Sequence, residues 1–125
     1  MPRGFVLFPL FRLASAEYQA KYIDNATIEA YADPDEMIND IFVPLDLILT
    51  RYRDNFTDKE LNSVLEYQQR LKQICNEVDY DIELYNLPEI WQEIMNLSLN
   101  LIHSLGYSLD NFDPEKDDWS KEFLS

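Results

Sequence analysis

Apolar residues recur along much of the chain with the period of an α-helix. After Asp33 they return every three or four positions as far as Tyr52, and the same step runs from Leu61 to Val78. Such spacing gathers apolar side chains on one face of a helix. The stretch 87–105 is apolar on almost every side, so we expect it to be the central helix of the domain. The pattern predicts an all-α fold.

Capping residues define where these helices are expected to begin. Segment 33–36 offers Asp33 as N-cap, Pro34 at the first helical position and Glu36 to complete a reciprocal box. Thr57 and Glu60 form a second such pattern. Helices are therefore predicted over 33–52, 57–78 and 87–105, the last ended by Gly106, with an earlier helix near 15–31 and a short terminal one after Asp113.

The sequence also predicts a distortion at Pro44, a loop over residues 79–86 and the inward face of the 57–78 helix. Pro44 falls inside the apolar stripe of the 33–52 helix, so a kink or a break and restart is expected there. Residues 79–86 alternate apolar and acidic positions without a partner strand, and we interpret them as an ordered loop. The expected inward face of the 57–78 helix comprises Leu61, Val64, Leu65, Gln68, Leu71, Ile74, Cys75 and Val78.

The N-terminal segment 4–13 is an apolar run that imitates a short signal peptide. Pro9 divides the run and Arg12 follows it, so we expect residues 5–13 to be a structural segment packed on the helices instead. The chain of 125 residues has the length of one domain, 1–125. The predicted architecture is an irregular bundle of about four helices plus a short C-terminal helix, without any stretch that spans a bilayer.

The net charge is the feature of the composition that says most about function. Twenty-four Asp and Glu residues against ten Lys and Arg residues give a formal net charge of -14. Seven acidic residues and no basic ones lie between Lys21 and Arg51, and nine lie between Lys72 and Lys116. A field of this sign repels nucleic acid and anionic membranes and speeds encounter with basic proteins. We expect a cytoplasmic protein with a basic macromolecular partner and no direct contact with nucleic acid or membrane.

Catalytic chemistry has little support in the sequence. His103 and Cys75 are the single histidine and cysteine, and they stand too far apart in the pattern to predict a zinc site or a nucleophile pair. His103 is expected to be partly buried and hydrogen-bonded, and Cys75 to be a small buried hydrophobe. The acidic pairs Glu36 with Asp40 and Glu89 with Glu93 lack the partners of a di-iron or calcium motif. We expect no enzyme activity, metal or cofactor.

Two acidic segments are the candidate partner-binding residues. Some acids of the first helical turns have a local role, because negative charge is favourable there. The acids of loop 79–86 have no such role, and they alternate with tyrosines that can anchor an interface. The candidate residues are Asp79, Tyr80, Asp81, Glu83 and Tyr85 in the loop, and Asp33, Asp35, Glu36 and Asp40 in the helix start.

A small, helix-rich, very acidic domain without enzymatic motifs resembles bacterial immunity proteins. These proteins neutralise toxins, often nucleases, of contact-dependent growth inhibition or colicin systems. The acidic clusters 33–40 and 77–83, with Tyr80 and Tyr85, carry the resemblance. It implies a tight one-to-one complex that covers the active site of a basic toxin or its nucleic-acid surface.

Two further classes stay open from the sequence. One is a nucleic-acid mimic of the anti-restriction type, which would need carboxylates spaced like phosphates along an elongated surface. The other is an acidic protein-interaction adaptor or antitoxin-like regulator. The class that the sequence favours least is an enzyme of unfamiliar type.

Overall fold

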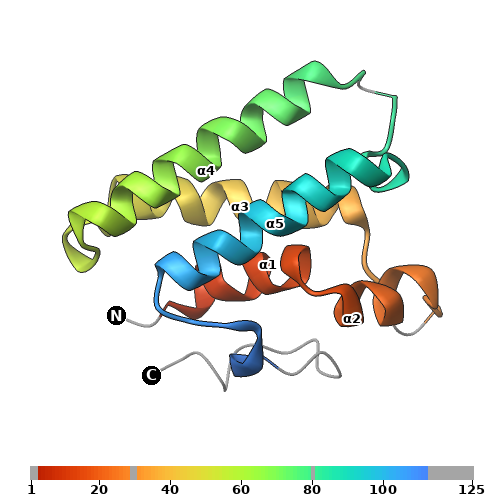
Figure 1. The fold of residues 1–125 in the computed structure, drawn as a ribbon, viewed down its shortest axis with the longest axis horizontal. Coiled ribbons are helices and arrows are strands. Elements are labelled where there is room, and N and C mark those ends of the chain that lie inside the picture. The colour runs from red at the N-terminus through yellow and green to blue at the C-terminus, as the bar shows by residue number, and fades with distance from the viewer. Residues whose placement is uncertain (1–2, 29–30, 80, 113–125) are drawn as a thin grey trace.

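The computed structural model describes residues 3–28, 31–79 and 81–112, and within these ranges it contains five α-helices and no strand. The four longer helices surround one apolar core (Figure 1). Helix α1 (Gly4–Ala14) contacts α3 (Pro34–Leu49) and α5 (Pro88–Ser104), and these two contact α4 (Asp58–Glu77). Helices α3 and α5 thus separate α1 from α4. The all-α bundle expected from the sequence is confirmed.

The apolar N-terminal segment forms helix α1 and supplies a large part of the core. Val6, Leu10 and Leu13 are 0% exposed, and Pro9 lies inside the helix without ending it. Phe11 stacks on Phe112 with ring centroids 4.5 Å apart. The expectation that residues 5–13 pack on the other helices is therefore confirmed, and the segment is itself helical.

The helix predicted near 15–31 is much shorter in the structure. Ser15 caps α2 (Ala16–Gln19), which continues as a π-helical turn, Ala20–Asp24. The segment ends at Asn25, whose backbone N–H and side-chain amide both donate to the Ala20 carbonyl, at 2.9 and 2.7 Å. Tyr18 and Tyr22 are buried as expected, but Ala26 is exposed.

Helix α3 begins where its cap predicts. Asp33 accepts a hydrogen bond from the Asp35 backbone N–H at 2.9 Å, so the observed cap bond goes to Asp35, one position before the expected box partner. The helix passes through Pro44 as one element and ends at Leu49, so the alternative of a break and restart there is wrong. The expected extension to Tyr52 is wrong as well.

Helix α4 carries the predicted capping box, with Thr57 Oγ1 accepting from Glu60 N at 3.1 Å and Glu60 Oε1 accepting from Thr57 N at 2.9 Å. Its inward face differs in two positions. Leu65, which was expected to face inward, is 41% exposed. Tyr67, which was not assigned to this face, is buried. The Tyr67 hydroxyl lies 2.9 Å from Ser98 Oγ of α5, which satisfies a polar group that would be costly to bury alone.

Helix α5 packs one face on α1 and α4, with Ile94 and Ile102 at 0% exposure. Trp91 and Leu101 are buried as well, whereas Leu97 and Leu99 are half-buried. Gly106 follows with φ at 90°, the left-handed conformation that ends many helices. The terminal helix expected after Asp113 lies outside the described residues. A 3₁₀ turn, Leu109–Asn111, leads to the buried Phe112.

Candidate partner-binding site

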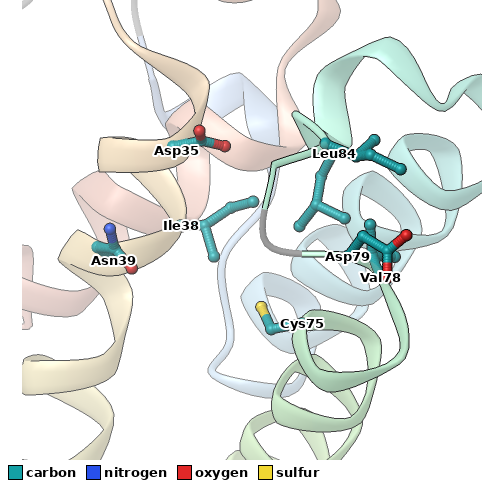
Figure 2. A pocket seen from close by; sticks show the side chains of 8 residues that line it. Asp35, Ile38, Asn39, Cys75, Val78, Asp79 and Leu84 are labelled. Carbon is teal, nitrogen blue, oxygen red and sulfur yellow. The ribbon is translucent and has the colours of Figure 1, made fainter.

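The two acidic segments predicted from the sequence meet at one end of the bundle. The N-terminus of α3 and the chain that follows α4 enclose a hollow of about 400 Å³ (Figure 2). Its lining includes Asp35 and Asn39 from α3 and Asp79 from the loop. Residues more than 40 positions apart in the sequence therefore contribute to one acidic surface.

The acidic residues of α3 differ in their local interactions. Asp33 is the N-cap, and exposed Asp35 and Glu36 lie in the first turn, where the helix dipole favours negative charge. Asp40 Oδ2 lies 3.7 Å from a guanidinium nitrogen of Arg12 in α1, and Asp40 is not part of the lining. Of the four predicted α3 residues, Asp35 is the one that lines the hollow.

On the loop side, the acids follow the C-terminus of α4. That helix has no basic residue in its last turn, and Glu77 is its final residue. Because a helix C-terminus carries partial negative charge, Glu77, Asp79 and Asp81 add to an already negative potential. Asp79, Asp81 and Glu83 are all exposed, and Glu83 Oε2 accepts a bond of 3.3 Å from the Asn86 side chain. Tyr80 lies outside the described residues.

Tyr85 is held by the fold, which the sequence reasoning did not anticipate. Its hydroxyl donates to Asp24 Oδ1 at 2.6 Å, and its ring meets Trp91 edge-on with centroids 5.0 Å apart. Burial, together with the hydrogen bond to Asp24, raises the pKa of Tyr85 to about 12. The side chain thus ties the loop to the end of the 16–24 helical segment.

Two exposed apolar side chains precede α3 in the sequence. Tyr31 is 67% exposed and stands two residues before Asp33, and Ile28 is 97% exposed. The backbone N–H of Ala32 donates to the Tyr22 carbonyl, which fixes this segment beside the α3 cap. The sequence reasoning placed both residues in a longer helix and so missed them. For Tyr31, the position two residues before the predicted Asp33 cap could have indicated that it lies outside the helix.

His103 and Glu93 are two further residues with side chains capable of chemistry. His103 is exposed, so the expectation of a partly buried histidine is wrong. Glu93 is engaged by Arg70 at 2.6 and 2.9 Å, and this hydrogen-bonded pair lowers the pKa of Glu93. Over the described ranges, no group of three His, Cys, Asp or Glu side chains could hold a metal ion.

Cys75 is half-buried, not fully buried as expected, and it lines the hollow. Its Sγ atom faces the space between α3 and the loop (Figure 2). Burial raises the pKa of the Cys75 thiol, and the negative charge of Asp35 raises it further. A group that favours the neutral thiol is a poor nucleophile.

The helices and the net charge define this protein as an acidic all-α bundle. No family model, curated protein or solved structure matches the chain. No helix in the described part of the chain is long and apolar enough to cross a membrane.

Proposed function

We propose that this protein is an immunity protein, which binds a basic bacterial toxin and neutralises it. The toxin is a nuclease whose active site or nucleic-acid surface becomes covered in the complex, which forms in the cytoplasm. The protein itself performs no catalysis and needs no cofactor. The observation that supports this best is the meeting of two acidic segments, distant in sequence, at one end of the bundle.

The sign of the charge favours this class of partner. Nucleases engage a polyanion through basic surfaces, so their own surfaces complement a chain of net charge -14. The placement of acids at the C-terminus of α4 supports a binding role further, because negative charge there opposes the helix dipole. A basic partner relieves that repulsion.

The test uses the product of the neighbouring reading frame, where a toxin and its immunity protein are encoded together. That product is expressed with and without this protein, and growth of the host is measured. We expect growth arrest by the toxin alone and rescue on co-expression. The purified pair should associate through electrostatic steering, so the association rate constant should fall at least about tenfold from low to high salt, with a smaller change in dissociation.

A neighbouring product that is neither toxic nor bound contradicts the proposal. An association rate constant that is independent of ionic strength removes the electrostatic part of it. Binding of a DNA-processing enzyme, with inhibition competitive against DNA, would instead favour a nucleic-acid mimic.

A further inference from the structure

The hollow between α3 and the loop combines an apolar interior with an acidic rim. Ile38 extends into it from α3, and Val78 and Leu84 line it from the other side (Figure 2). Ile82, another lining residue, is 44% exposed, although most apolar residues of this size are in the core. An apolar surface left open to water inside an acidic rim is suited to a ligand with both an apolar and a cationic part.

The rim supplies oxygen acceptors from two different elements. Asp35 and Asn39 stand on the α3 wall, and Figure 2 shows the Asp35 carboxylate directed toward the space. Asp79 stands on the wall formed by the end of α4 and the loop, with its carboxylate turned away from α3. The α4 C-terminus, without a basic residue in its last turn, adds partial negative charge on the second wall. The higher pKa of the Cys75 thiol is consistent with this, because Asp35 contributes to it after burial. The negative potential therefore reaches the interior of the hollow.

We propose that this hollow receives an arginine side chain of the basic partner. The aliphatic stem lies on Ile38, Val78 and Ile82, and the guanidinium pairs with the carboxylate of Asp35, while Asp79 adds negative charge on the opposite wall. A guanidinium suits this rim, because it carries a permanent positive charge and its planar fork presents five donors to carboxylate oxygens. The inference rests on the proposed function for the origin of the arginine, and it names the anchoring subsite of that interface.

A bare divalent cation is a poorer match to the same residues. Such ions need several oxygen ligands converging on one point. The hollow brings only two carboxylates, one from each wall, and no three-residue metal group occurs in the described residues. The open apolar lining would also gain nothing from a hydrated ion, whereas an arginine stem covers it.

The experiment measures entry of an arginine side chain into the hollow of the full chain. Two peptides are titrated into ¹⁵N-labelled protein: acetyl-Gly-Arg-Gly-amide, and the same peptide with citrulline, a neutral isostere of arginine. We expect the arginine peptide to shift amide signals at 35–39, 75–79 and 82–84 with a Kd of about 1–10 mM. The citrulline peptide should bind at least about tenfold more weakly, because it lacks the charge that the rim recognises.

Matched variants separate the hollow from the general acidity of the chain. Asp35→Asn with Asp79→Asn should weaken binding of the arginine peptide at least about tenfold. Asp54→Asn with Asp110→Asn changes the net charge equally at exposed sites on other elements, and should change the Kd less than about twofold. Equal binding of both peptides would overturn the proposal, and so would shifts spread over all the exposed acids. The comparison of two peptides on the unaltered protein holds even if a variant folds poorly.

Failure of this inference is distinguishable from failure of the proposed function. If the toxin is bound and neutralised but the arginine peptide does not enter the hollow, the subsite is wrong and the function stands. If the peptide enters the hollow while the neighbouring product is neither toxic nor bound, the subsite stands and the assigned partner is wrong.

Discussion

Glu60 shows how a single side chain can support two parts of the fold. Its carboxylate completes the capping box of α4 and accepts bonds of 2.6 and 3.2 Å from the Arg3 guanidinium. Burial alone would raise the pKa of Glu60, but the hydrogen bonds from Arg3 and Thr57 outweigh it and lower the pKa. The charged form of Glu60 is therefore favoured in the folded state.

Glu60→Gln should reduce the free energy of unfolding at neutral pH by about 1–2 kcal/mol, because the amide keeps the cap but loses the charge-assisted bonds. Since the folded-state pKa is lowered, this contribution is present above the unfolded pKa near about 4.3 and is lost as pH falls through the folded value. Urea unfolding at pH 7 and at about pH 3 measures the difference. The exposed Glu66→Gln serves as control, and an effect of Glu60→Gln that is equal at both pH values would contradict this account.

Among single residues, the sequence predicted interactions between positions close in the chain, but not those between residues of different helices. The Thr57 capping box depends on four consecutive residues, so the pattern was sufficient. Tyr67 lies in helical step with the buried Val64 and Leu71, and the prediction overlooked it in favour of Leu65. The pairing of the Tyr67 hydroxyl with Ser98 joins two helices and has no local signal. The bond that holds Tyr85 to Asp24 was likewise not predictable, because it joins residues 61 positions apart.

Helices α3, α4 and α5 were predictable because caps and apolar periodicity are local signals. Helix α1 carries no such pattern, since it is apolar on most sides and contains Pro9. Its place in the core follows from its packing on both α3 and α5. The helix expected near 15–31 ends at Asn25 in the structure, and the apolar pattern of the sequence gives no sign of that end.

Leu10→Ala in α1 and Ile94→Ala in α5 should each destabilise the protein by about 2–5 kcal/mol, because both side chains are 0% exposed and each leaves a cavity. Thermal and urea unfolding measure the loss. Val43→Ala on α3, where the side chain is 65% exposed, is the matched control and should change the free energy of unfolding by less than about 1 kcal/mol. A melting temperature of the Leu10 variant close to that of the parent would show that α1 is peripheral.

For the molecule as a whole, the acidity of the candidate site was predictable and its shape was not. The sequence singled out residues 33–40 and 77–85, but only the tertiary fold brings the start of α3 against the end of α4. The same fold brings Asp40 close to Arg12 and exposes Tyr31, two residues before the α3 cap. The hollow with its apolar interior has no signature in a linear pattern, because its lining comes from separate elements.

The affinity of charge-reversed protein for the product of the neighbouring reading frame tests the central claim most directly. The test variant carries Asp79→Lys, Asp81→Lys and Glu83→Lys, all in an exposed loop without capping duties. The control carries Asp54→Lys, Glu66→Lys and Asp110→Lys, which make the same change in net charge at exposed positions elsewhere. We predict that the loop variant stays folded and loses more than about a hundredfold in affinity, or about 2.7 kcal/mol, while the control loses less than about tenfold. A loop variant with full affinity beside a control that has lost it would contradict the assignment of the interface to this end of the bundle.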